Sequence, residues 1–253
     1  MSTVSVVLPT YNESGNIVRL VEDLLAVLGA QADVIVVDDD SPDSTADRAR
    51  ARFDDDDRVR VIRRTADRGL ARAIRCGIEA ARGEILVVMD ADFNHDPRVV
   101  PRLVERLEGA DLVVGSRFVR GGGMEDRARL MCSGAFSFLA GTLLGTGATD
   151  NLSGFFAART GFIRGFSPDS IFRGYGDYFF RLLFHAARTG ARIDEVPIYY
   201  ARRTAGESKS RLVPMLARYS LEVLRLAVTR GRDVLPPARA RSDLTVGRRR
   251  NSS

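Results

Sequence analysis

The sequence predicts an α/β protein with a mostly parallel sheet that carries helices on both faces. Apolar, β-rich runs alternate with segments of helical spacing over residues 1–116, which is the pattern of consecutive β-α-β units. The apolar runs are nearly continuous, as expected for strands that are buried on both faces. No Gly-x-Gly-x-x-Gly motif follows the first run, so an ordinary dinucleotide-binding domain is disfavoured.

The first half predicts five strands and four helices in alternation. Val and Ile dominate the strand segments, and both residues favour extended backbone. The second helix has a starting signal, with Ser41 as N-cap, Pro42 in the first helical position and Asp43 in the first turn. The expected strands cover 3–9, 33–38, 58–63, 84–90 and 111–116, and the expected helices cover 14–28, 43–52, 69–81 and 97–108.

The second half is less regular, and the C-terminal end differs in composition from the rest. Its expected elements are helices over 127–147 and 175–189 and strands over 153–158 and 192–200. The expected organisation is one domain over 1–210 with halves 1–116 and 117–210, an amphipathic helix over 211–232 and a disordered basic tail over 233–253.

The positive charge of the chain is concentrated near its C-terminus. The 253 residues have a net charge of +5, and residues 201–253 hold thirteen Lys or Arg against four Asp or Glu. Such a segment can contact nucleic acid or an anionic membrane; because the excess lies in the tail, nucleic-acid binding is only a distant alternative. Lys209 is the only lysine in the sequence, which suggests a need for a compact ammonium group.

Two further features indicate the cellular compartment. The two cysteines, Cys76 and Cys132, are far apart and follow no metal-binding or disulfide pattern. The N-terminal segment lacks a basic start and turns polar by Thr10, unlike a signal peptide. Both features fit a reducing cytoplasm.

Two acids follow directly on an apolar strand in VVMDADFNHDP, residues 87–97. Asp90 and Asp92 precede the helix that Pro97 starts, so capping does not explain them, whereas His95 reads as a helix-start residue. The two carboxyl groups of a glycosidase flank the scissile bond, but two acids in one D-x-D turn converge on a single cation. Mg²⁺ and Mn²⁺ are held by such carboxylates together with substrate phosphates. We therefore predict a metal–diphosphate site at the carboxyl edge of the sheet.

Five motifs together resemble those of family-2 glycosyltransferases, and within that family the polyprenol-phosphate (dolichol-phosphate) mannose synthases. In chain order they are VSVVLPTYNESGNI, VIVVDDDSPDSTAD, GEILVVMDADFNHDP, DLVVGSRFVRGGG and IDEVPIYYARRTAGESKSR. The resemblance implies a nucleotide-diphospho-sugar-binding, Rossmann-like fold and a Mg²⁺- or Mn²⁺-dependent enzyme that inverts the anomeric carbon. It further implies GDP-mannose as donor, a polyprenyl phosphate as acceptor and a peripheral location at the cytoplasmic face of the membrane. A separate membrane-anchoring subunit is compatible with it.

The resemblance also assigns the site residues by position. They are Pro9, Tyr11, Glu13, Val37 and Asp39 around the nucleotide; Asp90, Ala91, Asp92 and Asn94 at the metal; Arg117, Arg203 and Lys209 at the phosphates; and Arg129 and Ser133 at the acceptor phosphate. Cations beside the leaving diphosphate would stabilise the negative charge that builds up there.

The chain departs from the family pattern at several positions, and these leave the acceptor open. Asp40 and Ser44 stand where the family has glycines, and Gly134 and Phe156 stand where many members carry arginine. The alternative is a family-2 enzyme with another nucleotide sugar and a hydroxyl acceptor, for which Asp177 is the candidate base. A lipid phosphate is already ionised at neutral pH, whereas a hydroxyl must lose a proton to a base.

Two segments are candidates for membrane contact. Residues 130–149 carry no charge, but nine of the twenty are Ser, Thr or Gly, so we expect a buried or membrane-skimming helix rather than a span. In the C-terminal helix, arginines recur every seven residues and form a basic stripe, which is typical of a helix on an anionic membrane surface. They are Arg211, Arg218, Arg225 and Arg232. An amphipathic helix packed on the domain would explain the pattern equally well.

Overall fold

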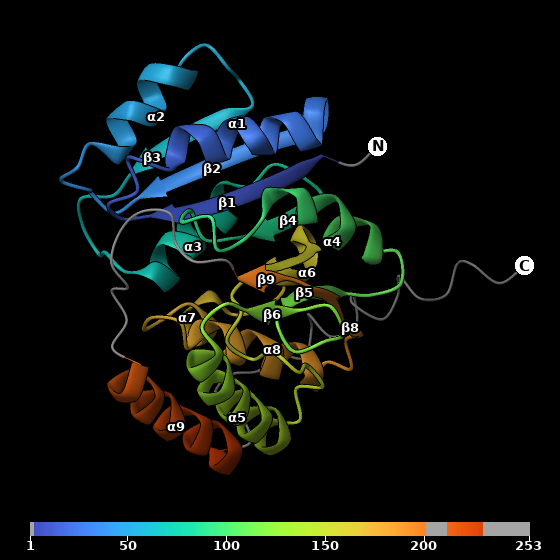
Figure 1. Ribbon diagram of the computed structural model, residues 1–253. Helices are drawn as coiled ribbons and strands as arrows, with labels where there is room; N and C mark the ends of the chain where they lie inside the picture. The colour runs from blue at the N-terminus through green and yellow to red at the C-terminus, as the bar shows by residue number, and fades with distance from the viewer. Residues whose placement is uncertain (1–2, 201–211, 230–253) are drawn as a thin grey trace, which may run out of the picture.

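A seven-stranded sheet forms the centre of the computed structural model, which describes residues 3–200 and 212–229 (Figure 1). The strand order is β3-β2-β1-β4-β7-β5-β8, and within the described ranges β7 alone runs antiparallel to its neighbours. The strands are β1 (Val4–Thr10), β2 (Ala32–Asp38), β3 (Val59–Arg63), β4 (Ile85–Val88), β5 (Leu112–Ser116), β7 (Phe156–Arg159) and β8 (Ile193–Pro197). The prediction of a mostly parallel sheet is confirmed.

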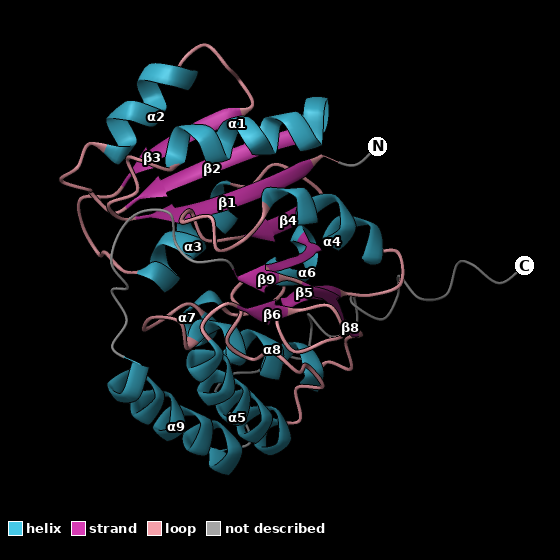
Figure 2. Ribbon diagram, in the orientation of Figure 1, coloured by secondary structure: helices cyan, strands magenta, loops and turns pink. Residues whose placement is uncertain are grey.

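Helices cover both faces of this sheet, as predicted (Figure 2). One face packs against α1 (Ile17–Leu28), α2 (Thr45–Phe53) and α4 (Val100–Arg106). The other face packs against α3 (Leu70–Ala80), α6 (Thr160–Arg164), α7 (Pro168–Ile171) and α8 (Tyr178–Arg188).

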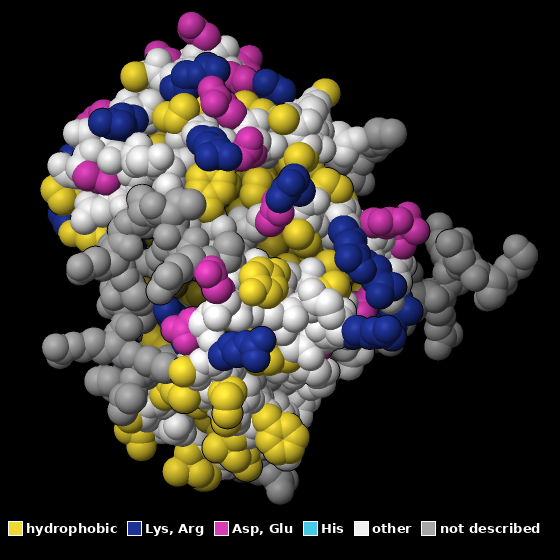
Figure 3. Space-filling view, viewed as in Figure 1, with side chains coloured by type: hydrophobic (Ala, Val, Ile, Leu, Met, Phe, Trp, Pro, Cys, Tyr) yellow, Lys and Arg dark blue, Asp and Glu magenta, His cyan; other side chains and the backbone are white. Residues whose placement is uncertain are grey.

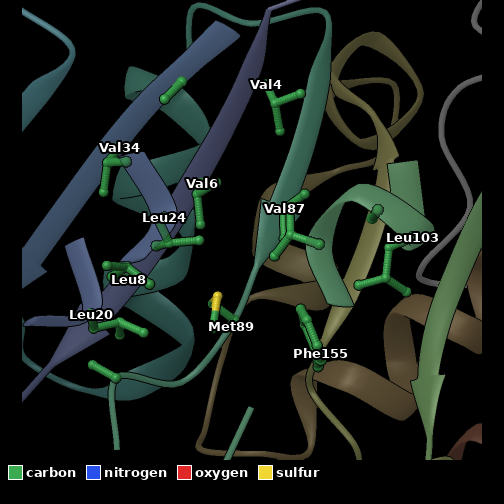
Figure 4. Packing of buried hydrophobic residues seen from close by; sticks show 14 of the residues in the cluster. Val4, Val6, Leu8, Leu20, Leu24, Val34, Val87, Met89, Leu103 and Phe155 are labelled. Atoms are coloured by element: carbon green, nitrogen blue, oxygen red, sulfur yellow. The ribbon is translucent and has the colours of Figure 1, made fainter. Parts of the chain in front are cut away.

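The strands are apolar on both sides because each side meets a helix layer. In β1, Val6 and Leu8 point toward Leu20 and Leu24 of α1 (Figure 4), whereas Val7 belongs to the core on the opposite face. All five side chains are fully buried. Burial of an aliphatic side chain of this size contributes about 1.5–3 kcal/mol, so the alternation fixes the register of the strand as well as its stability.

A third layer lies below the sheet and contains two long helices, α5 (Arg127–Leu144) and α9 (Leu212–Thr229). The two helices lie side by side and share a core with α8 (Figure 1). A second, two-stranded sheet, β6 (Gly123–Met124) with β9 (Tyr199–Tyr200), connects this layer to the main sheet.

The start of α2 differs from the prediction. Ser41 does not cap the helix, since its hydroxyl donates to the Asp38 carboxylate at 2.5 Å. The helix begins at Thr45, after Ser44 adopts a left-handed conformation with φ of 65°. Asp40, the other residue at a family glycine position, is also left-handed, with φ of 57°. The two substitutions therefore occupy positions where glycine would be unstrained.

Other boundaries differ because the chain changes partners. The predicted strand 192–200 is divided into β8 and β9. Between them, the Ile198 N–H donates to the carbonyl of Ser116, the last residue of β5, and the Ile198 carbonyl accepts from the Gly123 N–H of β6. The predicted strand 84–90 ends at Val88, before the acidic pair. The tail over 233–253 and the ends of the predicted helix 211–232 lie outside the described residues.

Candidate active site

An open cavity lies beyond the carboxyl ends of β1, β2 and β4. Its volume of about 1340 Å³ exceeds the range of about 300–1,000 Å³ that is usual for one small ligand, so it has room for more than one. Ten of the predicted site residues line it: Pro9, Tyr11, Glu13, Asp39, Asp90, Ala91, Asp92, Asn94, Arg117 and Arg129. Met215 and Tyr219 of α9 also line it, so the cavity extends from the sheet to the α5–α9 layer.

The acidic pair occupies a tight loop after β4. The strand ends at Val88, and Phe93 turns the chain with φ of 60°. The Asp92 carboxylate accepts hydrogen bonds from the Asn94 backbone N–H at 3.1 Å and from its side-chain Nδ2 at 2.8 Å. The loop thereby fixes the orientation of Asp92 beside Asp90 in the cavity wall.

The side chains of this loop suit a hard divalent cation. Two carboxylates and one side-chain amide alternate along five residues, and oxygen ligands of this kind match Mg²⁺ and Mn²⁺. Over residues 3–200 and 212–229, no three His, Cys, Asp or Glu side chains are grouped so as to hold a metal ion. Asn94 and substrate phosphates would therefore have to complete the set, as is common for Mg²⁺.

His95 supports the acidic loop from inside the protein, which the sequence did not indicate. Its ring is fully buried, its Nδ1 accepts the backbone N–H of Asp90 at 2.9 Å, and its Nε2 lies 2.6 Å from the Tyr200 hydroxyl. Burial lowers the pKa of His95 to about 4, so the ring is neutral at pH 7. The interpretation of His95 as a helix-start residue is wrong, because Asp96 caps the following turn, Pro97–Val99.

The loops after β1 and β2 are hydrogen-bonded to each other. The backbone N–H of Glu13 donates to the Thr45 hydroxyl at 2.9 Å. The backbone N–H of Ser14 donates to the Asp43 carboxylate at 3.0 Å. These bonds hold one wall of the cavity, from which Tyr11 projects with 44% of its surface exposed.

Asp39 lies in the same wall and is nearly buried. Its carboxylate accepts from Arg64 Nη1 at 2.6 Å and from the backbone N–H of Gly69 at 2.6 Å. Burial raises the pKa of Asp39, although the Gly69 hydrogen bond and the Arg64 charge oppose the rise. Asp39 is therefore an oriented acceptor at the cavity surface.

Arg117 lines the cavity but has a partner within the protein. Its Nε and Nη2 donate to the two oxygens of Asp150, both at 2.8 Å, and its guanidinium lies over the Tyr200 ring at 4.9 Å. Burial alone would lower the pKa of Arg117, but the hydrogen bonds and charge of Asp150 raise it. The guanidinium is thus a fixed positive charge at the cavity, held by a buried carboxylate.

Three predicted site residues within the described ranges do not line the cavity, namely Val37, Ser133 and Asp177. Val37 was expected at the nucleotide, but its side chain is fully buried in the core on the α3 side. Ser133 was expected beside Arg129 at the acceptor phosphate, but it is 3% exposed and lies under the surface of α5. Only Arg129 of that pair reaches the cavity.

Asp177, the candidate base, also lies outside the cavity lining. Its carboxylate pairs with Arg181, which is 1% exposed, at 2.6 Å. It also accepts the backbone N–H of Tyr175 at 2.6 Å. Glu222 of α9 approaches the same Arg181 nitrogen at 3.2 Å. Asp177 therefore belongs to a buried ionic network that holds the cavity rim at Tyr175.

The remaining assignments and omissions concern the far end of the chain. Arg203 and Lys209 lie outside the described residues. Tyr200, Met215 and Tyr219 line the cavity but were not predicted. Tyr200 directly precedes the segment with Arg203 and Lys209, and that position was the available signal.

Comparison with known proteins identifies a family and several relatives. A model of the family described as Glycosyl transferase family 2 matches residues 5–166. The chain is 42% identical over 217 residues to the undecaprenyl-phosphate mannosyltransferase of Micrococcus luteus, a match that covers 80% of this chain and 85% of that protein. It is 33% identical over 215 residues to the dolichol-phosphate mannosyltransferase of Saccharomyces cerevisiae, covering 81% of this chain and 80% of that protein.

A solved structure is similar over nearly the whole chain. Glucosyl-3-phosphoglycerate synthase from Mycobacterium tuberculosis, in complex with Mn²⁺, UDP and glucosyl-3-phosphoglycerate, has a TM-score of 0.66 and 25% identity. The similarity covers 94% of this chain and 82% of that one. The related structure thus holds a divalent metal together with a nucleoside diphosphate.

Proposed function

Because the chain belongs to glycosyl transferase family 2 and is a glycosyltransferase, we propose that it transfers mannose from GDP-mannose to a polyprenyl phosphate. The names of the two mannosyltransferases that it resembles support this sugar and this class of acceptor. The observation that carries the proposal is one cavity that reaches from the D-x-D loop to the helices α5 and α9.

The donor binds at the sheet side of the cavity. Tyr11 and Asp39 contact the nucleoside, and Asp90 and Asp92, with Asn94, would hold Mg²⁺ or Mn²⁺ for the donor diphosphate. When bound, the metal neutralises the charge that develops on the leaving diphosphate. The buried Arg117 guanidinium, held in place by Asp150, adds a fixed positive charge at the cavity wall, and such preorganised charge acts on the transition state without reorganising.

The acceptor phosphate binds at the α5 side, next to Arg129. One of its oxygens attacks C1 of the sugar while the bond from C1 to the diphosphate oxygen breaks. The electron pair of that bond leaves with the nucleoside diphosphate, and the configuration at C1 inverts. Because the attacking oxygen is already ionised, no base is needed. The pairing of Asp177 with Arg181 outside the cavity supports this acceptor over a hydroxyl.

An exposed apolar surface on α5 and α9 supports a membrane location. Figure 3 shows hydrophobic side chains gathered over the lower part of the molecule, where Figure 1 has these two helices. The surface consists of Met131, Phe138, Leu139, Leu143, Leu221, Leu224 and Val228, each 50–77% exposed. Water-exposed groups of large apolar side chains mark interaction sites.

The charges beside this surface favour an anionic bilayer as the partner. Arg218 and Arg225, two members of the predicted basic stripe, are exposed on α9 next to Leu221 and Leu224. Such a combination is typical of helices that lie in a membrane interface. Among residues 3–200 and 212–229, no helix is long and apolar enough to cross a bilayer. From the exposed apolar side chains and the two arginines beside them, we propose that the enzyme acts as a peripheral protein at the cytoplasmic face of the membrane.

The decisive experiment offers several nucleotide sugars with a polyprenyl phosphate and identifies the products by mass spectrometry. We expect polyprenyl-phosphate mannose from GDP-mannose. Asp92→Asn and excess EDTA should each abolish transfer without unfolding the protein. Full activity in EDTA would contradict the metal role, and transfer to a hydroxyl compound alone would contradict the acceptor.

The membrane surface has a separate test. A polarity-sensitive dye on Cys132, which is exposed on α5, should report an apolar environment when vesicles with anionic lipid are added. Neutral vesicles serve as the control, and Phe138→Ser with Leu224→Ser should remove the response. An unchanged dye signal in the presence of anionic vesicles would contradict membrane docking through α5.

A further inference from the structure

His95 occupies a position between the metal-binding loop and the strand β9. Its ring is 0% exposed and stacks on Phe155 with ring centroids 4.7 Å apart. A buried imidazole among apolar groups is costly unless both nitrogens are hydrogen-bonded. In His95 both nitrogens are hydrogen-bonded, Nδ1 to the backbone N–H of Asp90 and Nε2 to the Tyr200 hydroxyl.

The hydrogen bonds determine the tautomer of this ring. Nδ1 accepts the Asp90 backbone N–H at 2.9 Å, so Nδ1 carries no proton. The proton of the neutral ring therefore lies on Nε2 and is donated to the Tyr200 hydroxyl at 2.6 Å. That hydroxyl in turn donates to the Ser153 carbonyl at 3.1 Å. In this series of three hydrogen bonds, every donor thus has one acceptor.

These hydrogen bonds join parts of the site that are far apart in sequence. At one end is the backbone of Asp90, a proposed metal ligand. At the other end is Tyr200, which immediately precedes the segment 201–211 that contains Arg203 and Lys209. The Tyr200 ring also lies under the Arg117 guanidinium at 4.9 Å.

We propose that His95 and Tyr200 are positioning residues, which fix the backbone at Asp90 relative to β9 and so set the metal affinity of the D-x-D loop. The inference rests on the proposed metal–diphosphate site. Groups that orient metal ligands without touching the metal typically change metal affinity 10–100-fold when they are removed. The acceptor function of Nδ1 is the essential one, because it alone contacts the metal loop.

Two substitutions separate the two hydrogen bonds. In His95→Asn, Oδ1 stands as many bonds from Cβ as Nδ1 does, so the bond to the Asp90 N–H can be kept while the bond to Tyr200 is lost. In His95→Gln, the side-chain amide can reach Tyr200 but offers no acceptor at the Nδ1 position. Tyr200→Phe removes the far bond and leaves the histidine in place.

The control is the other histidine of the chain. His185 is also fully buried, but neither of its nitrogens has a hydrogen-bond partner in the described part of the chain. His185→Gln therefore introduces the same chemical change in a buried position that does not support the metal loop.

The measurement is the dissociation constant of Mn²⁺ in the presence of GDP, read from the EPR signal of free Mn²⁺, with thermal melting as a check of folding. We expect His95→Gln to weaken Mn²⁺ binding about 10–100-fold, and His95→Asn and Tyr200→Phe to weaken it measurably but less, by about 3–10-fold. His185→Gln should leave it unchanged. In turnover, the Mn²⁺ concentration for half-maximal rate should rise in the same order.

The outcomes distinguish this inference from the proposed function. If the wild type binds Mn²⁺ and His95→Gln binds it equally well, the positioning role is wrong and the metal site stands. If the wild type does not bind Mn²⁺ with GDP, the metal site is wrong and this inference fails with it. Should His95→Gln not fold, Tyr200→Phe decides, since wild-type Mn²⁺ affinity in that folded variant would also overturn the link.

Discussion

Replacing Asp177 by Asn tests whether this carboxylate is a base or a structural anchor. Arg181 is 1% exposed, and its Nη1 lies 2.6 Å from Asp177 and 3.2 Å from Glu222. The substitution removes the nearer negative charge and leaves the guanidinium with one carboxylate. The cavity rim at Tyr175, whose N–H donates to Asp177, loses part of its support at the same time.

The expected cost follows from the environment of Arg181. Removing one partner of a buried ion pair costs about 3–5 kcal/mol. Glu222 remains, and the carbonyls of Ile171 and Arg173 still accept from Arg181, so we expect the lower end, about 3 kcal/mol in the free energy of unfolding. For a domain of this size that corresponds to a fall in Tm of about 6–12 °C.

The assay combines denaturation with initial rates measured well below the Tm of the variant. We expect Asp177→Asn to lose stability but to keep its transfer rate to lipid phosphate within about threefold of the wild type. Arg129→Ala is the matched variant, with little loss of stability and a large loss of lipid-phosphate use. An Asp177→Asn protein with wild-type stability and no transfer would refute the structural role and would favour the hydroxyl acceptor.

Three further predictions concern other positions. Burial and the nearby Arg181 charge lower the pKa of His185 to about 4, below the unfolded value of about 6.5. Protonation of His185 should therefore cost the wild type about 3 kcal/mol of stability as the pH falls from about 6.5 to 4, in addition to the loss that His95 contributes over the same range. Urea denaturation of His185→Leu should show a shallower acid loss, and parallel pH profiles would contradict this. Ser44→Gly should raise the free energy of unfolding by about 1 kcal/mol, because it relieves a left-handed φ of 65°. The gain should appear as a higher urea midpoint at unchanged slope, and an unchanged midpoint would contradict the strain at Ser44. Lys209→Ala should remove about 2–4 kcal/mol of transition-state stabilisation, measured as a fall in kcat/KM, and Lys209→Arg should restore only part of it. Wild-type turnover in the alanine variant would show that this lysine is incidental.

The place of several cavity-lining residues could be predicted because it depends on a regular feature of parallel sheets. The residues after β1, β2 and β4 follow strands that are recognisable from continuous Val and Ile runs. Parallel strands have their carboxyl ends at one edge, so residues that directly follow such strands lie close together, and Tyr11, Asp39 and Asp90 do line one cavity. No tertiary contact had to be known in advance.

The supporting contacts could not be predicted, since they join residues that the sequence keeps far apart. His95 and Tyr200 are 105 residues apart, and Asp177 meets Glu222 only through a shared arginine. The direction of β7 was equally hidden, because an apolar run buried on both faces looks the same in either orientation. The burial of Ser133 likewise depends on how α5 packs on its neighbours, which helical spacing does not specify.

Helix α9 bears on the choice of acceptor because it contributes to the inside and the outside of the site. Tyr219 lines the cavity and is 2% exposed, whereas Leu221 and Leu224, two and five positions further on, are 71% and 57% exposed. Glu222, between them, reaches inward to Arg181. A hydroxyl-bearing sugar needs no apolar surface next to its binding site. A polyprenyl phosphate does, because its charged head must enter the cavity at Arg129 while its hydrocarbon chain stays out of water. The arrangement of α9 therefore favours the lipid acceptor independently of Asp177, and the two variants of Asp177 and Arg129 test the same choice by chemistry.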